Sequence, residues 1–234
     1  MSILCTICAR GSSKGIKNKA LVNFKGKPLI FYTIKQALNA KIFKEVIVST
    51  DSLKIQKIAQ SYGAKSWFLR PKNISGDNSS KLLAIRHAFI EAELFFKRKF
   101  DICFDLDLTS PLRNLDDIKK ALKKFKKGNF NNLFSVTEAK KNPYFNMVEK
   151  NKNTYSLSKK SKKNIFSRQK TPKVFELNAA IYIFSRKFLL KKDKLFNKYS
   201  SIFVMPRERS IDIDDYLDLK LAKYLFKNDK KLFK

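Results

Sequence analysis

Short apolar segments alternate with helical patterns along this chain, and this alternation constrains the fold more than any other feature of the sequence. Residues 3–9 and 46–49 are almost continuously apolar, which is typical of parallel strands that are buried on both faces. Less regular segments of the same kind follow at 66–69, 101–106, 133–136 and 179–184. We expect helices at 28–41, 52–62, 81–96 and 116–127, and a last helix that starts at Asp212 or Asp214. Strands that alternate with helices predict an α/β fold, a three-layer α/β/α, doubly wound and mostly parallel sheet.

One domain, 1–234, accounts for the length of the chain, although the stretch 142–174 interrupts the alternation. This stretch is rich in Lys, Asn and Ser, and its apolar side chains occur in near alternation at Tyr144, Phe145, Met147, Val148, Tyr155 and Leu157. We expect a small β-hairpin and a long loop there. Because an isolated hairpin needs a surface to pack on, the stretch is either a surface insertion or a dimerisation arm.

Charge and composition bear on the class of partner. The net charge of +31 suggests nucleic acid, because positive patches attract polyanions regardless of sequence. Most of the 51 basic residues, however, are lysines scattered along almost every segment, whereas proteins that read bases favour arginine. We therefore expect no specific nucleic-acid partner, and a basic nucleic-acid-binding module stays the alternative from another class. No apolar run approaches the roughly 20 residues of a membrane span, and the sequence shows no export signal, so we expect no membrane partner and a cytoplasmic location.

A cationic turn with small residues follows the first apolar segment, at Cys8-Ala9-Arg10-Gly11-Ser12-Ser13-Lys14-Gly15, with Lys19 shortly after it. Backbone N–H groups of small residues can close on phosphate oxygens, and Arg10, Lys14 and Lys19 would neutralise their charge. The turn matches neither the Walker A pattern nor G-x-G-x-x-G, so an ordinary solvated loop is the alternative interpretation. Its position directly after the first strand favours phosphate binding.

Three more polar segments belong at the carboxyl edge of the sheet, where open parallel sheets bind their ligands. They are residues 69–80, 104–113 and 210–215. The last two contain alternating carboxylates, Asp105 with Asp107 and Asp212 with Asp214, and a helix cap is the alternative interpretation of Asp214. Mg²⁺ typically takes one or two carboxylates together with substrate phosphates. A cationic turn and acidic segments at one edge together imply a metal-bound nucleoside triphosphate.

Six blocks of the sequence occur in the order and at the spacing of a known family. They are Ala9-Arg10-Gly11-Ser12-Ser13-Lys14-Gly15 with Lys19; Arg70-Pro71 with Asp77; Thr109-Ser110-Pro111-Leu112-Arg113; Arg168-Gln169 with Pro172; Asn178-Ala179-Ala180-Ile181-Tyr182; and Asp212-Ile213-Asp214 with Leu217-Asp218. In these blocks the chain resembles the acylneuraminate cytidylyltransferases, which activate nine-carbon α-keto acid sugars as CMP conjugates. The resemblance implies a Rossmann-like nucleotidyltransferase fold, CTP and a nonulosonic acid as substrates, Mg²⁺ as cofactor and a homodimer.

The resemblance also implies roles for individual residues. Nucleotide-binding residues would be Arg10, Gly11, Ser12, Ser13, Lys14 and Lys19 at the phosphates, with Arg70, Asp77, Asn78, Ser79 and Ser80 near the nucleoside. The magnesium ligands would be Asp212 and Asp214. Sugar-binding residues would be Asp107, Thr109, Ser110, Arg168, Gln169, Glu176, Asn178 and Tyr182. Of these, Arg168 and Gln169 would reach the neighbouring subunit's site from the dimerisation arm.

Departures from the family's pattern bear on the sugar. Sialic-acid enzymes of the family usually have Gln where this chain has Asp107, and often an Arg where it has Glu176-Leu177 before Asn178-Ala179. Their Lys after the preceding proline is absent from Asn142-Pro143-Tyr144-Phe145. In these features the chain is more similar to the CMP-legionaminic acid synthetases, so we rank a legionaminic-type acid first, sialic acid second and pseudaminic acid third. Related synthetases for an eight-carbon keto acid have a metal-binding aspartate near this strand end, so Asp107 is either a sugar contact or a magnesium ligand.

The reaction that the resemblance implies is in-line attack by the anomeric C2 hydroxyl of the sugar acid on the α-phosphorus of CTP, with release of pyrophosphate. Positioning and charge stabilisation would supply most of the catalysis. Arg10 and Lys14 would stabilise the departing pyrophosphate, and Asp214 is the first candidate for the general base. Removal of one such cation is expected to cost on the order of 10²–10³ in rate, by analogy with a lost oxyanion donor.

Overall fold

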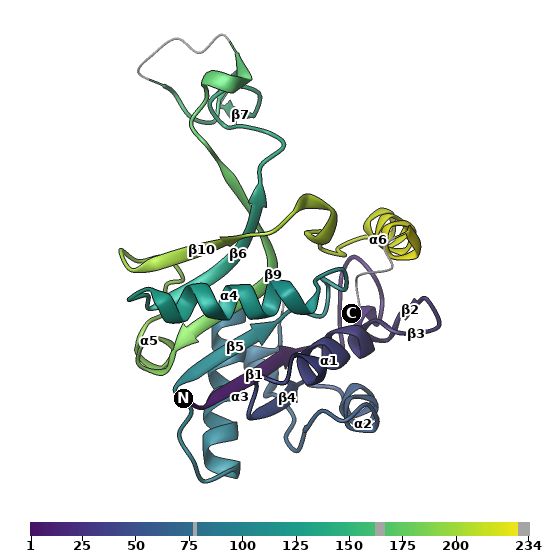
Figure 1. Ribbon diagram of the computed structural model, residues 1–234. Helices are drawn as coiled ribbons and strands as arrows, with labels where there is room; N and C mark the ends of the chain where they lie inside the picture. The colour runs from purple at the N-terminus through teal and green to yellow at the C-terminus, as the bar shows by residue number, and fades with distance from the viewer. Residues whose placement is uncertain (77–78, 162–166, 229–234) are drawn as a thin grey trace.

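A six-stranded sheet with the strand order β10-β6-β9-β5-β1-β4 forms the centre of the computed structural model, which describes residues 1–76, 79–161 and 167–228 (Figure 1). The strands are β1 (Ile3–Cys8), β4 (Glu45–Ser49), β5 (Ile102–Leu106), β6 (Asn132–Glu138), β9 (Phe175–Ser185) and β10 (Ser200–Val204). β1 pairs in parallel with β4 and β5, and β10 with β6, whereas β9 is antiparallel to both of its neighbours. The predicted α/β class with a mostly parallel sheet is confirmed.

Two layers of helices cover the sheet. They are α1 (Leu29–Ala40), α2 (Leu53–Ser61), α3 (Lys81–Phe95), α4 (Leu115–Lys127), α5 (Arg186–Lys191) and α6 (Tyr216–Asn228), and a small hairpin of β2 (Asn23–Phe24) and β3 (Lys27–Pro28) precedes α1. Side chains of α1, α2, α4 and α6 pack in one apolar cluster with the sheet, and those of α3 and α5 pack in a second cluster. None of the helices in the described part of the chain is long and apolar enough to cross a membrane.

Alternation along β1 explains why this segment is so apolar. Ile3, Cys5 and Ile7 point into the cluster on the α1 side, and Leu4 points into the cluster on the α3 side. All four side chains are nearly or fully buried. Because successive side chains of a strand face opposite ways, a central strand with helices on both sides needs apolar residues at almost every position.

The predicted strand at 66–69 is wrong, because this segment meets β4 only through two isolated bridges, at Lys65 and Leu69. Side chains of α2 take the place of a continuous ladder. Gln56 Nε2 donates to the carbonyl of Phe68 at 3.0 Å, and Gln60 Nε2 donates to the carbonyl of Ser66 at 2.6 Å. The two glutamines satisfy these carbonyls inside the segment, whereas the backbone at its two ends, Lys65 and Arg70, hydrogen-bonds to β4 and Thr50.

The start of the last helix also differs from the prediction. α6 begins at Tyr216 rather than at Asp212 or Asp214. The reason is that Asp215 Oδ1 accepts hydrogen bonds from the N–H groups of Leu217 (2.8 Å) and Asp218 (2.9 Å), which is the geometry of a helix cap. Asp212 and Asp214 therefore lie before the helix, and Asp215 rather than Asp214 caps it.

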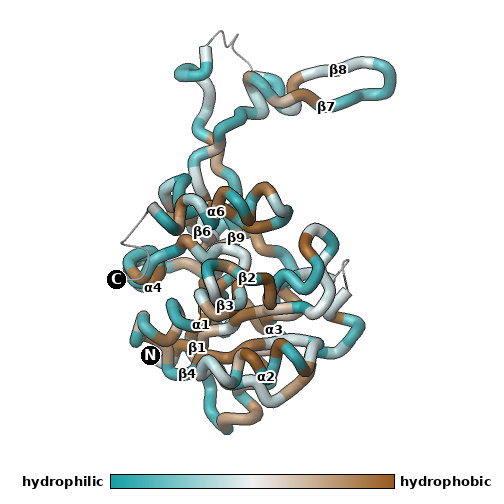
Figure 2. The backbone as a smooth tube through the Cα atoms, turned by 90° about the vertical axis from the view of Figure 1, so that its right-hand side faces the viewer, coloured by the Kyte–Doolittle hydropathy of each residue, from teal (hydrophilic) through white to brown (hydrophobic). Residues whose placement is uncertain are grey.

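The stretch 142–174, called the arm below, lies away from the sheet (Figure 1) and projects from the body as a thin extension (Figure 2). It contains two short antiparallel strands, β7 (Val148–Asn151) and β8 (Thr154–Leu157), and its residues 162–166 lie outside the described residues. β6 and β9 continue into its base, where Glu138 pairs with Phe175. The apolar side chains of the hairpin are 39–71 % exposed, namely Met147, Val148, Tyr155 and Leu157. The role of the arm in dimerisation stays a prediction.

Candidate active site

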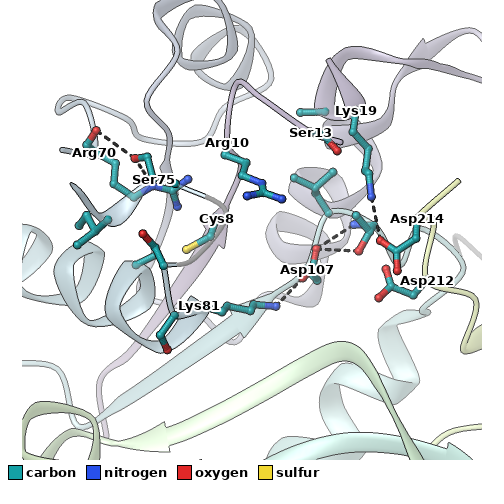
Figure 3. A pocket seen from close by; sticks show the side chains of 18 residues that line it. Cys8, Arg10, Ser13, Lys19, Arg70, Ser75, Lys81, Asp107, Asp212 and Asp214 are labelled. Atoms are coloured by element: carbon teal, nitrogen blue, oxygen red, sulfur yellow. Dashed lines mark hydrogen bonds and ion pairs between the residues drawn. The ribbon is translucent and has the colours of Figure 1, made fainter. Parts of the chain in front are cut away.

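A pocket of about 310 Å³ opens at the carboxyl ends of β1 and β5 (Figure 3). Ten residues predicted for the site line it, namely Arg10, Ser13, Lys19, Arg70, Ser79, Ser80, Asp107, Thr109, Asp212 and Asp214. Arg70 lies at one end of the pocket, Asp212 and Asp214 lie at the other, and Arg10 lies between them (Figure 3). The fold thus brings four segments that are far apart in the sequence around one cavity, and their roles stay predictions.

The first turn is held by a side chain from the segment between β4 and α2. The Gly11 N–H donates to Asp51 Oδ1 at 2.6 Å, so this N–H is already engaged, and the neighbouring Ser52 caps α2. Ser12 and Lys14 belong to the same turn and are exposed, but neither is among the residues that line the pocket. Two further predicted nucleotide-binding residues, Asp77 and Asn78, lie outside the described residues.

Gly15 lets the first turn pack directly against the acidic segment before α6. A Cβ atom built on Gly15 would lie 2.0 Å from the carbonyl oxygen of Asp214, which leaves no room for a side chain. Lys19 Nζ lies 3.0 Å from Asp214 Oδ1, and the Ile213 N–H donates to the carbonyl of Thr109 at 2.9 Å. The acidic segment is therefore joined both to the cationic turn and to the end of β5.

Asp212 is the carboxylate in the described pocket lining that has a buried oxygen with an unmet hydrogen bond. Its Oδ1 is buried and has no hydrogen-bond partner among the described residues. Burial, and after it the negative charge of Asp107, raises the pKa of Asp212 to about 6. A buried acceptor without a donor, next to the exposed carboxylate of Asp214, fits a cation that also needs phosphate oxygens. Within the described part of the chain, no group of three or more His, Cys, Asp and Glu side chains could hold a metal ion without such help.

Lys81, the first residue of α3, is a pocket residue that the sequence analysis missed. Its Nζ lies 2.5 Å from Asp107 Oδ2 and 3.4 Å from Asp105 Oδ2 (Figure 3 shows the first contact). Burial alone would lower the pKa of Lys81, but the two carboxylates outweigh it and raise that pKa. Burial raises the pKa of Asp105, which is fully buried. The signal that could have found Lys81 is its place at a helix start that follows Ser79 and Ser80 at the same edge of the sheet.

Arg113 fixes the backbone on which Asp107 sits. Its guanidinium is fully buried and donates to the carbonyls of Ala180 and Asp107 and, at 3.0 Å, to Gln36 Oε1. Burial lowers the pKa of Arg113 to about 10. The Thr109 N–H and hydroxyl both donate to Asp107 Oδ1, at 3.1 and 2.9 Å. Asp107 is therefore held from its backbone and from its side chain.

Asn178 and Ser110, predicted sugar contacts, make internal contacts outside the pocket lining. The Asn178 side chain accepts from Ser135 Oγ at 2.6 Å and donates to Ser210 Oγ at 2.9 Å, so it links β6 and β9 to the segment before α6. Ser110 is fully buried and donates to the Asn178 carbonyl at 3.4 Å. Both side chains therefore have structural partners in this chain.

The other four predicted sugar residues lie along β9 and the arm. Tyr182 lies next to the pocket, with Lys81 Nζ 4.4 Å from the centre of its ring. Glu176 lies at the base of the arm, where it accepts from the Lys140 N–H at 3.1 Å. Arg168 and Gln169 lie in a 3₁₀ turn of the arm, outside the pocket of their own chain.

Known proteins resemble this chain over nearly its whole length. A family model described as cytidylyltransferase matches residues 4–232. The CMP-N,N'-diacetyllegionaminic acid synthase of Campylobacter jejuni is 44 % identical over 95 % of this chain and 94 % of that protein. The pseudaminic acid cytidylyltransferase of the same species is 38 % identical over 97 % of both. Among solved structures, CMP:2-keto-3-deoxy-manno-octonic acid synthetase complexed with CTP matches with a TM-score of 0.69 and 17 % identity, over 97 % of this chain and 99 % of that one, which shows a shared fold.

Proposed function

We propose, from the premise that this chain belongs to the cytidylyltransferase family, that it transfers CMP from CTP to the anomeric hydroxyl of a nonulosonic acid and releases pyrophosphate. The observation that carries the proposal is the close packing of the cationic first turn against the acidic segment, at Gly15 and Asp214. This packing puts cationic and acidic side chains on the wall of one pocket. A metal-bound triphosphate needs both kinds of side chain.

A legionaminic-type acid is our first choice of sugar, ahead of sialic acid and pseudaminic acid. The relatives named for legionaminic and pseudaminic acid are 44 % and 38 % identical to this chain, so overall identity separates these two sugars only narrowly. The residues proposed to contact the sugar should decide which acid is used. A buried polar group that finds no partner on the wrong sugar weakens the binding of that sugar strongly. Asp107 is the first residue to examine in this respect.

The nucleotide would lie along the pocket from Arg70 to the acidic segment. Arg70 is buried and its Nε donates to Ser75 Oγ at 3.1 Å, so its guanidinium is held in place for the nucleoside. Arg10 and Lys19 would neutralise the triphosphate from the pocket wall, and Lys14 from the rim of the first turn. Preorganised cations of this kind stabilise the charge that develops on the leaving pyrophosphate.

The acidic segment would hold the metal and receive the proton. Asp212 and Asp214 are the residues we propose for Mg²⁺, which when bound supplies Lewis-acid polarisation of the α-phosphoryl group. Asp214 is also our first candidate for the base that accepts the proton of the C2 hydroxyl, because its carboxylate is the exposed one of the two.

The arm would complete the site in a homodimer. Arg168 and Gln169 lie on the arm and do not line the pocket of their own chain, so they contact the sugar only if a second copy brings them to it. The exposed apolar side chains of the hairpin also need a surface to cover them. A cytoplasmic location and the lack of a specific nucleic-acid partner complete the proposal.

The test is pyrophosphate release from CTP and Mg²⁺ with a panel of legionaminic, pseudaminic and sialic acids. We expect release that depends on CTP and is fastest with a legionaminic-type acid. Release with none of the acids would contradict the proposal. A gel shift on duplex DNA at physiological salt tests the nucleic-acid alternative, which predicts tight and strongly salt-dependent binding without any dependence on CTP.

A further inference from the structure

The carboxylate of Asp107, just after β5, already has partners on both of its oxygens within this chain. Asp107 Oδ2 lies 2.5 Å from Lys81 Nζ, and Asp107 Oδ1 accepts two hydrogen bonds from Thr109. Asp105 Oδ1 accepts from the Thr6 hydroxyl at 2.7 Å. Asp105 Oδ2 has no hydrogen-bond partner among the described residues, but its charge is balanced by the same Lys81 ammonium at 3.4 Å. One lysine therefore bridges two carboxylates, in the way that a divalent cation would.

The position of this lysine is fixed by the fold. Lys81 is the first residue of α3, and the Ser80 hydroxyl caps that helix by accepting from the Leu82 N–H at 3.2 Å. The ring of Tyr182, with its centre 4.4 Å from Lys81 Nζ, lies against the ammonium on β9. Because the helix start, the ring and two carboxylates all hold the same group, its place does not depend on a bound ligand.

Asp212 differs from Asp107 in this respect. Its buried Oδ1 has no hydrogen-bond partner among the described residues, and both residues line the pocket. A cation that enters the pocket therefore finds an unmet acceptor on Asp212, whereas on Asp107 it would have to displace an ammonium ion. The two aspartates are thus suited to different roles.

We propose that Lys81 is a positioning residue whose ammonium takes the place of a divalent cation at the end of β5, directs Asp107 to the sugar, and leaves Asp212 and Asp214 to hold the metal. This inference rests on the proposed function and deepens it, because it assigns Asp107 to the sugar rather than to magnesium. A purely structural Lys81, which only balances the buried charge of Asp105, is the competing explanation.

Binding of Mn²⁺, used as a paramagnetic probe and counted by EPR on the intact protein with and without CTP, tests the assignment. We expect Asp212→Asn to weaken Mn²⁺ binding by more than the roughly 10- to 100-fold that loss of an outer-shell partner costs, and Asp107→Asn to leave it almost unchanged. We expect Lys81→Met to bind one additional Mn²⁺, and Lys81→Met combined with Asp107→Asn to lose it again. Equal losses in the two aspartate variants, or no additional Mn²⁺ in Lys81→Met, would overturn the proposal.

Kinetics distinguish positioning from a structural role. We expect Lys81→Met to raise the KM for the sugar acid by roughly 10- to 100-fold while the KM for CTP changes little, and Lys81→Arg to recover part of the loss. Equal changes in both KM values would overturn the proposal. Since Lys81→Met leaves Asp105 buried without a counter-charge, the variant that also carries Asp105→Asn keeps the comparison possible if the single variant fails to fold. If the parent releases no pyrophosphate with any acid, the proposed function fails, whereas the Mn²⁺ counts without CTP still report on Lys81.

Discussion

The two aspartate pairs of the pocket differ in what balances their charge. Asp105 is fully buried and Asp107 largely so, and the chain supplies the ammonium of Lys81 between them. Asp214 is 76 % exposed and forms an ion pair with Lys19, while the buried oxygen of Asp212 has no hydrogen-bond partner in the described part of the chain. Both pairs have the sequence pattern Asp-x-Asp. The counter-charge provided by the fold, rather than the pattern, therefore separates an acidic site that is already filled from one that is open to a cation.

The largest effect that we expect from a single substitution comes from the open pair. Asp212→Asn should lower the rate of pyrophosphate release on the order of 10²–10³-fold. The substitution removes a proposed ligand of the cation, and a bound cation would stabilise the charge on the reacting phosphates. The matched control is Asp215→Asn, because Asp215 caps α6 and does not line the pocket. Similar losses in both variants, measured with CTP and the best acid, would end the distinction between the open pair and a helix start.

Gly15→Ala tests whether the open pair depends on its contact with the first turn. The added methyl would lie 2.0 Å from the Asp214 carbonyl oxygen, so we expect a loss of about 1–3 kcal/mol in the free energy of unfolding. Mn²⁺ binding should weaken in parallel. Gly76→Ala is the control, because its Cβ would meet Ser79 Oγ at an ordinary 3.8 Å. Urea unfolding of the two variants measures the difference, and equal stabilities would show that the two segments separate easily.

The pH dependence of stability should also distinguish the open pair. The pKa of Asp212 is about 6 in the folded protein and near 3.8 when unfolded, so between these values the folded chain binds more protons. The contribution of Asp212 to stability should therefore fall as the pH rises from about 4 to about 6 and stay constant above that. Urea midpoints of the metal-free protein across this range, compared with Asp212→Asn, measure this contribution. Parallel curves for the two proteins would show that Asp212 titrates normally.

The smallest effect concerns Ala179, which neighbours the asparagine that links the sheet to the segment before α6. Ala179 has a φ of 52° within the irregular pairing of β6 and β9, next to Asn178, whose side chain reaches Ser135 and Ser210. Ala179→Gly should stabilise the protein by about 1 kcal/mol, because glycine adopts positive φ without steric cost. Thermal melts measure it, and Ala180→Gly should instead destabilise. Mn²⁺ binding should not change in Ala179→Gly, and a destabilised variant would mean that the conformation is unstrained.

Local patterns of the sequence predicted much of the fold. The first strand was found because burial on both faces requires continuous apolar residues, and α4 because its apolar residues recur at helical spacing before Gly128. The pocket was located by a general rule, since the carboxyl ends of parallel strands meet at one edge. Arg10, Arg70 and Asp212 consequently lie around one cavity, as expected.

Contacts between residues that are far apart in the sequence could not be predicted from it. The direction of β9 depends on pairing with β5 and β6, and nothing in residues 179–184 encodes that direction locally. Lys81 and Asp107 are 26 residues apart, so their ion pair follows only from the way α3 packs on the sheet. Asn178 was predicted to bind sugar, yet its amide is used within the chain, which only the positions of Ser135 and Ser210 reveal.

The continuity of β9 has a mechanical consequence for the arm. This strand of 11 residues runs from Phe175, at the base of the arm, to Ser185, and it includes Tyr182, which contacts the pocket residue Lys81. The arm is therefore a rigid continuation of a central strand of the sheet rather than a loop attached to its surface. A molecule that binds to the arm is therefore held in a fixed position relative to the pocket by the pairing of β9 with its neighbours. A one-residue insertion near Phe175 would turn the β9 side chains on one side of the insertion to the opposite face of the sheet.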